Sequence, residues 1–190
     1  MSRIADRGAI TAAYVGIGMA ATISVSFLLV IPIEAIVWLL ALPSGVMIGY
    51  YANARSDRRR GPWRRILSNA LFAGAVTGLT AALLLLGTKA LFFAADSGFR
   101  DPGLGGPLNC SPGADCVYQR YLGDGRGPQL AAVGVTDAGS FTAFYWREQV
   151  STATTLFLLT VVGSGIGGGL YGVFRPKPEA HQADRVPGSA

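Results

Sequence analysis

The two cysteines are the residues of this chain best suited to covalent chemistry. Cys110 and Cys116 lie in the turn-rich segment Asn109-Cys-Ser-Pro-Gly-Ala-Asp-Cys116. A disulfide across so short a segment persists in an oxidising compartment. Catalysis of thiol oxidation toward a quinone would need a Cys-x-x-Cys pair and a second pair to relay electrons, whereas the chain has 2 cysteines in all. We therefore predict a structural disulfide.

Other catalytic and cofactor chemistry lacks the residues that it needs. The chain has 1 histidine, His181, in the polar carboxyl-terminal segment, which excludes a pair of imidazoles for haem. No Gly-x-Ser-x-Gly nucleophile motif occurs, and the glycines from Gly165 to Gly172 lie within an apolar stretch, without the strand that a dinucleotide fingerprint requires. We expect no catalytic, cofactor-binding or metal-binding residues, so the sequence favours a protein that is not an enzyme.

Any functional residues must be positioned by four long apolar stretches, which cover residues 10–31, 33–52, 66–94 and 150–174. Each has about the 20 residues that a helix needs to cross roughly 30 Å of hydrocarbon. The composition agrees, with 51% hydrophobic and 14% charged residues and a mean hydropathy of +0.40. The sequence predicts an all-α membrane protein: one domain over residues 1–174, a four-transmembrane-helix bundle with a long extracytoplasmic loop, 95–149, between the third and fourth helices. Residues 175–190 are predicted to form a flexible cytoplasmic tail.

Positive charge predicts the orientation of this bundle. The connection between the second and third stretches carries a cluster of arginines, and short connections of this kind stay in the cytoplasm. We therefore expect a multi-pass protein of the cell inner membrane with both termini in the cytoplasm. A basic cluster can also bind nucleic acid, but a position between two spans favours topology and contact with anionic lipid instead. The arginines with this expected role are Arg58, Arg59, Arg60, Arg64 and Arg65.

Small residues recur at every fourth position in the apolar stretches. Such spacing lets helix backbones approach closely in lipid, where packing rather than water expulsion holds helices together. We expect the third and fourth helices to pack along these positions, while association with another chain is the alternative use of them. The glycines predicted to serve helix packing are Gly74, Gly78, Gly165, Gly168, Gly169 and Gly172.

Two charged residues near the ends of the stretches could form a polar pair within the membrane. Glu34 begins the second stretch and Lys89 lies near the outer end of the third. Both can reach water at the membrane surface, and both are expected at the same depth. Pro43 predicts a kink in the second helix. Transport of protons or cations usually needs a carboxylate near the membrane midplane, which the apolar stretches lack.

The long loop is rich in glycine and proline, so we expect a compact cap with little regular structure. Residues 116–119 and 129–135 are composed like short strands, but without sustained alternation. Aromatic residues from Phe141 to Trp146 predict a belt at the membrane surface and an interfacial helix that continues into the fourth span.

The layout of the chain resembles an uncharacterised family of bacterial four-helix membrane proteins, a domain of unknown function. The similar features are the tight first hairpin, the charged connection around Arg58, the glycines of the third stretch and the ending Gly168-Gly-Leu-Tyr-Gly172. The resemblance implies no activity or site residues. We expect a structural or accessory protein, a small subunit of a larger respiratory or transport complex, with lipids and other membrane subunits or its own copies as partners. A small oligomeric transporter or channel is the alternative.

Overall fold

The computed structural model describes residues 5–29, 34–56, 61–100 and 102–174, and within these ranges the side chains of residues 25–29, 34–39 and 104 are left out. All regular structure in the described ranges is helical, which confirms the all-α prediction. The elements are α1 (Arg7–Leu29), α2 (Glu34–Ala54), α3 (Trp63–Ala95), the short 3-10 helix η1 (Pro102–Leu104), α4 (Ala114–Gly123), α5 (Gly127–Ala132) and α6 (Ala138–Phe174).

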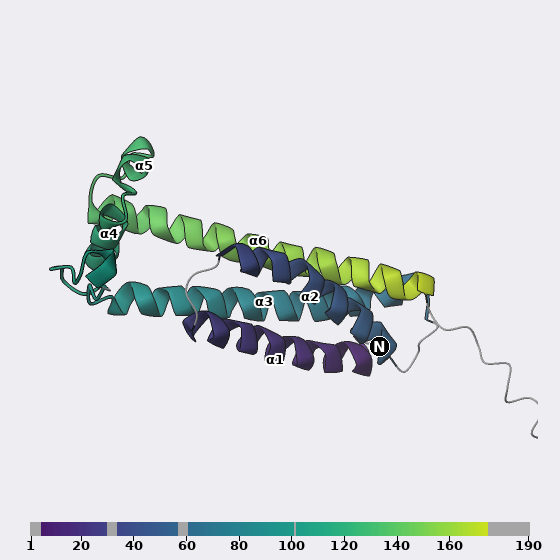
Figure 1. The fold of residues 1–190 in the computed structure, drawn as a ribbon. Coiled ribbons are helices and arrows are strands. Elements are labelled where there is room, and N and C mark those ends of the chain that lie inside the picture. The colour runs from purple at the N-terminus through teal and green to yellow at the C-terminus, as the bar shows by residue number, and fades with distance from the viewer. Residues whose placement is uncertain (1–4, 30–33, 57–60, 101, 175–190) are drawn as a thin grey trace, which may run out of the picture.

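Four long helices lie side by side and form a bundle, while α4 and α5 form a cap at one end of it (Figure 1). α2 packs against α1, α3 and α6, and α3 packs against the other three, so the α2 and α3 pair lies between α1 and α6. The last turns of α3 and the first turns of α6 extend past α1 and α2 and carry the cap (Figure 1). The cap therefore stands on two helices that also form the core of the bundle.

Local sequence explains where the two longest helices begin. Pro62 precedes α3 with a φ of −63°, and its carbonyl accepts the N–H groups of Arg65 and Ile66 at 2.9 and 3.2 Å. Asp137 precedes α6, and its carboxylate accepts a hydrogen bond from the N–H of Ser140 at 2.8 Å. The Ser140 hydroxyl in turn accepts one from the N–H of Asp137 at 3.2 Å. The N–H groups of Arg65, Asp137 and Ser140 thereby gain partners at helix starts, where the regular bond to the carbonyl four residues earlier is missing.

Two helices of the described chain are long and apolar enough to cross a membrane. α3 has 33 residues and a best window of mean hydropathy 2.0, and α6 has 37 residues and a value of 1.7. At 1.5 Å per residue these helices are roughly 50 and 55 Å long, so each exceeds the hydrocarbon layer of about 30 Å. The facing ends of α1 and α2, and the connection between them, fall largely outside the described residues and side chains.

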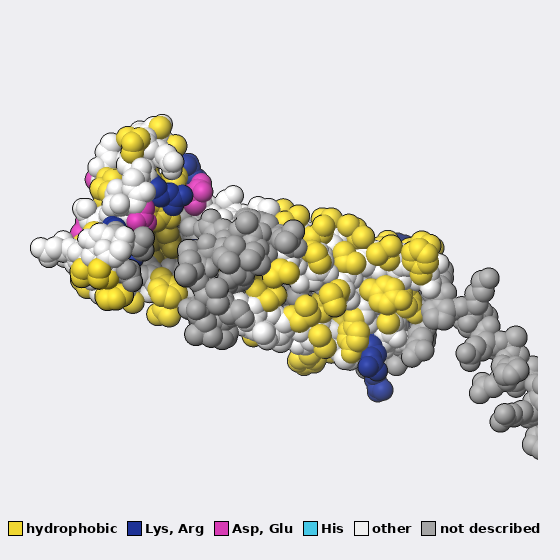
Figure 2. Space-filling model, in the orientation of Figure 1, with side chains coloured by type: hydrophobic (Ala, Val, Ile, Leu, Met, Phe, Trp, Pro, Cys, Tyr) yellow, Lys and Arg dark blue, Asp and Glu magenta, His cyan; other side chains and the backbone are white. Residues whose placement is uncertain are grey.

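The surface of the bundle is strongly apolar. Large side chains such as Leu83, Leu91 and Val162 are 60%, 62% and 55% exposed. Figure 2 shows hydrophobic side chains over much of the visible bundle. The acidic side chains visible in this view lie on the cap beside basic ones, and further basic side chains lie toward the opposite end of the bundle. Monomeric soluble proteins rarely expose apolar area on this scale, so another apolar medium or partner must cover it.

The cap differs from the sequence expectation, because its described residues form helices where little regular structure was expected. Residues 116–119, which are composed like a strand, lie within α4, and much of 129–135 lies in α5. Apolar side chains at helical spacing in α4 and α5 close over the first turns of α6, which buries Val117, Leu130 and Phe141 in one cluster. Burial in this cluster outweighs the weak strand propensity of two short segments. α6 is continuous from the cap into the bundle, as predicted for the interfacial helix.

Candidate functional site

A disulfide braces the cap, and an ion pair fastens the cap to the end of α3. Cys110 and Cys116 are bonded to each other, with Cα atoms 5.1 Å apart, as predicted. Arg120 of α4 donates two hydrogen bonds, at 2.7 and 3.0 Å, to Asp96, the residue directly after α3. Burial raises the pKa of Asp96, but the bonds from Arg120 and from the N–H of Gly98 outweigh it and hold the pKa below its ordinary value.

Loss of the disulfide is expected to loosen the cap without unfolding the bundle. The bridge closes a segment with a sequence separation of 6 residues, and for so short a loop the entropy model gives about 2 kcal/mol. Reduction of the native chain should therefore increase hydrogen exchange in α4 while α3 and α6 stay protected. Alkylation of either cysteine by a maleimide before any reductant is added would contradict the bridge.

An aromatic cluster seats the cap on the two long helices. Phe141 is fully buried, with the rings of Tyr121 and Tyr118 centred 5.0 and 5.3 Å away. Phe93 of α3 stacks on Tyr145 of α6 at 4.7 Å. The prediction of an aromatic belt at the membrane surface is therefore wrong for Phe141 and Tyr145, because both side chains face the protein core, at 0% and 6% exposure.

The centre of the bundle is closed by Ser164 and three glycines, which we call the Ser164 junction. The Ser164 hydroxyl, fully buried on α6, donates a hydrogen bond to the carbonyl of Ala70 on α3. Gly45 and Gly49 bring the backbone of α2 against the same turn of α6, and Gly74 brings α3 against the Ser164 side chain. A methyl group at any of these three glycines would overlap backbone or side-chain atoms around Ser164. Three helices thus meet here without intervening space.

The glycines predicted from sequence fall into two groups. Four of them face neighbouring helices: Gly74 lies against Ser164, Gly78 against Phe157 and Thr160, Gly168 against Ala70, and Gly172 against Trp63. The other two face outward. A methyl group at Gly165 would meet only Leu71, at 3.6 Å, and one at Gly169 would meet open space. One face of α6 therefore serves packing inside the chain and the neighbouring face does not.

The sequence analysis missed the glycines that join α2 to α6. Methyl groups at Gly163 and Gly167 would collide with the carbonyl oxygens of Leu42 and Val46 on α2. Gly45 and Gly49 stand opposite them on α2. The available signal was the spacing of Gly163 with Gly167 and of Gly45 with Gly49, each of the small-xxx-small kind.

At the end of the bundle away from the cap, four polar residues join α1, α2 and α3, and we call them the Asp6 clamp. Asp6 is 7% exposed, and its carboxylate accepts hydrogen bonds from Ser56, which follows α2, and from Asn69 of α3, the latter at 2.9 Å. Arg65 lies 3.6 Å away. The same carboxylate caps α1 by accepting the N–H of Ala9 at 3.1 Å.

The ionised form of Asp6 is the favoured one. Burial raises the pKa of the Asp6 carboxyl, but the hydrogen bonds from Ser56, Asn69 and Ala9 and the charge of Arg65 lower it, and the net effect is a pKa below the ordinary value of 3.8. The sequence analysis missed this clamp. A usable signal was the aspartate one residue before the start of an apolar helix, a common N-cap.

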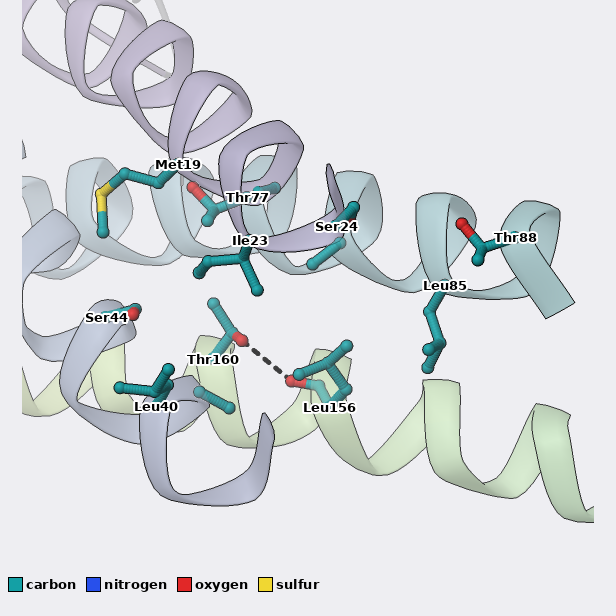
Figure 3. Close-up of a pocket in the computed structure, with 13 residues that line it drawn as sticks. Met19, Ile23, Ser24, Leu40, Ser44, Thr77, Leu85, Thr88, Leu156 and Thr160 are labelled. Atoms are coloured by element: carbon teal, nitrogen blue, oxygen red, sulfur yellow. Dashed lines mark hydrogen bonds between the residues drawn. The ribbon is translucent and has the colours of Figure 1, made fainter. Parts of the chain in front are cut away.

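A hollow lies among the four long helices (Figure 3). It has about 60 Å³ of space for water-sized groups, and Ile23 of α1 points across it toward Thr160 of α6 (Figure 3). The hydroxyls of Thr77 and Thr160 are bonded to the carbonyls four residues earlier, both at 2.9 Å. Its described lining carries apolar and hydroxyl side chains and no titratable group. The wall of this hollow is therefore apolar, with a few hydroxyl groups that are partly committed to their own helices.

The structure describes only some of the charged residues that the sequence predicts as sites. Glu34 is the first residue of α2, but its side chain lies outside the described residues, so the pair with Lys89 stays a prediction. Arg58, Arg59 and Arg60 also lie outside the described residues. Arg64 is exposed and Arg65 belongs to the Asp6 clamp. Within the described chain, no group of three His, Cys, Asp or Glu residues could hold a metal ion.

Comparison of the chain with protein-family models, curated proteins and solved structures finds no match.

Proposed function

We propose that the chain is an integral membrane structural or accessory protein, built as a four-span bundle and serving as a small subunit of a larger membrane complex. The observation that carries this proposal is the Ser164 junction. A solute crossing the interior of one bundle would have to pass between α2, α3 and α6, where glycine backbone lies directly against Ser164. Transporters instead keep polar, water-lined sites near the bilayer midplane. An interior that is closed at the level of Ser164 fits a scaffold.

Two separate features support one orientation of the bundle in the cell inner membrane. Arg64 and Arg65 stand in the first turn of α3, and positive residues beside a span favour the cytoplasmic side. The disulfide lies in the cap at the other end of α3, roughly 50 Å away by helix length, and disulfides persist on the oxidising side. Both features favour an orientation with the cap outside the cytoplasm and the amino-terminal end of α3 inside.

The outward glycines give the proposed subunit a surface for other membrane helices. Gly18 of α1 and Gly169 of α6 have open space where a side chain would stand. Neighbouring large apolar residues such as Ile166 and Val173 are exposed, at 47% and 67%. A helix of another subunit or of a second copy can approach such glycines closely in lipid.

The test is the composition of the particle obtained when the tagged chain is extracted together with its surrounding lipid. We expect stoichiometric partner subunits and a native mass well above that of one chain. Recovery of the chain alone, under every mild condition of extraction, would contradict the proposal. Replacement of Gly169 by Leu, which fills only open space in the isolated bundle, should release the partners if that face is the contact.

A small oligomeric transporter or channel is the second candidate, and the hollow of Figure 3 favours it because it opens among all four helices. In this case the pathway would include the hollow and would use the charged pair near the membrane surface. Reconstituted liposomes should then show solute flux that falls in Glu34→Gln and Lys89→Met. Flux that both variants leave unchanged would remove these residues from the mechanism.

A further inference from the structure

A second hollow, which we call the cap pocket, lies where the cap joins α6. It has about 250 Å³ of space for water-sized groups, between α5, the end of α4 and one face of α6. Tyr145, Gln149 and Thr152 line it from α6, four and three residues apart, so they share one face of that helix. In contrast to the hollow inside the bundle, this pocket is lined mainly by polar atoms.

The cap pocket has one charged residue of each sign, both exposed, and the two form no ion pair with each other. Arg126 lines one side, with its guanidinium carbon 4.7 Å from the centre of the Tyr121 ring, and Glu148 lines the side formed by α6. Within the described chain, ion pairs closer than 4.0 Å are formed by Arg65 and by Arg120 but not by these two residues. The guanidinium of Arg126 and the carboxylate of Glu148 therefore line the same space, with their nitrogen and oxygen atoms more than 4.0 Å apart.

Two further polar groups of the pocket are uncommitted. The side chain of Gln149 is 9% exposed, and its amide makes no hydrogen bond within the described part of the chain. α6 has four threonines, at positions 142, 154, 155 and 160, whose hydroxyls bond the carbonyl four residues earlier. Thr152, the threonine in the pocket, has no such bond among the described residues. Both groups are open to the pocket, where water or a ligand can form hydrogen bonds with them.

We propose that the cap pocket binds a zwitterion that carries an oxyanion and a primary ammonium, of the phosphoethanolamine kind. Arg126 pairs with the oxyanion and Glu148 with the ammonium, while Gln149 and Thr152 supply neutral hydrogen bonds between them. A guanidinium suits a phosphate, since it offers several parallel donors. The pocket supplies one partner for each end of such a molecule.

The position of the pocket favours a lipid headgroup as the source of this zwitterion. Arg147 and Glu148 are the last charged residues of α6, and the helix continues without charge to Phe174. If α6 crosses the membrane as proposed above, the pocket lies at the level of the lipid phosphates. This part of the inference rests on the proposed membrane placement, whereas the zwitterion chemistry does not.

The test uses the full-length chain and two ligand sources. In lipid discs of phosphatidylcholine with added phosphatidylethanolamine, native mass spectrometry should find phosphatidylethanolamine retained selectively, because the choline ammonium has no N–H to donate to Glu148. In detergent, free phosphoethanolamine should bind measurably by calorimetry. Arg126→Gln and Glu148→Gln should each weaken binding about tenfold or more, the loss expected for one hydrogen bond to a charged group.

Two matched variants control for charge and for folding. Arg147→Gln removes the charge next to Glu148, and Asp124→Asn removes an exposed carboxylate near Arg126, but neither residue lines the pocket. Both should bind like the native chain. Binding of free phosphoethanolamine without lipid selectivity supports the site and overturns the headgroup as its source. Equal binding by the native chain, Arg126→Gln and Glu148→Gln overturns the proposal. The detergent measurement needs no partner subunit, so its outcome is separate from that of the proposed function.

Discussion

Gly167→Ala is expected to destabilise the bundle by roughly 1–3 kcal/mol, the usual cost of overpacking a tight core, whereas Gly169→Ala leaves its stability unchanged or raises it. A methyl group at Gly167 would stand 2.8 Å from the carbonyl carbon of Val46 and 2.9 Å from the nitrogen of Tyr50. These are backbone atoms of α2, which cannot rotate away as a side chain can. At Gly169 the same methyl group meets nothing within 4 Å and gains the better helix propensity of alanine.

The measurement is the free energy of unfolding of both variants by titration with a denaturing detergent in mixed micelles. The pair is closely matched, because the two glycines are separated by one residue on the same helix and receive the same substitution. Equal destabilisation by the two substitutions would show that α2 does not pack against α6 as described. A larger effect of Gly169→Ala in native membranes than in micelles would instead indicate that a partner covers that face.

Helix formation in this chain could be predicted from the sequence because it depends on local features. The apolar stretch over 66–94 lies within α3, and that over 150–174 forms the second part of α6. Contact between α3 and α6 was also predictable, since Gly74 and Gly168 stand at small-residue positions.

The pairing of α2 with α6 was harder to predict, because in a membrane helix the lipid-facing and protein-facing sides are both apolar. Hydropathy therefore does not show which face of α2 carries Gly45 and Gly49 toward α6. The sequence Pro43-Ser-Gly45 predicts a kink, and this prediction says nothing of the packing of Gly45 against α6. The cap helices were missed for a different reason. α4 and α5 have 10 and 6 residues, and over such lengths a helical and an extended pattern cannot be separated, so burial around Phe141 decides.

The Asp6 clamp was the least visible feature, because its members are separated by up to 63 residues in sequence. Ser56 and Asn69, taken alone, are ordinary polar residues near helix ends. Only the fold brings both beside one carboxylate.

Asp6→Ala is expected to destabilise the bundle by about 3 kcal/mol, since it removes an N-cap and leaves two donors without a charged acceptor in a buried position. Asp137→Ala is the matched control. Asp137 also caps a helix, with its carboxylate on the N–H of Ser140 at 2.8 Å, but it is exposed and bonds only residues of its own turn. Its substitution should cost much less. Similar costs for the two substitutions would show that Asp6 acts as a local cap and does not hold α1, α2 and α3 together.

The pH dependence of this effect follows from the lowered pKa of Asp6. A carboxyl whose pKa is lower in the folded than in the unfolded state stabilises the fold above its unfolded value, and the contribution disappears as the pH falls through the folded value. The stability difference between the native chain and Asp6→Asn should therefore be largest near neutral pH and shrink below the ordinary pKa of 3.8. A double-mutant cycle adds a second check, because Asn69→Ala should cost less in the Asp6→Ala chain than in the native one. A difference that stays constant down to strongly acid pH would show that the charge of Asp6 contributes nothing to the clamp.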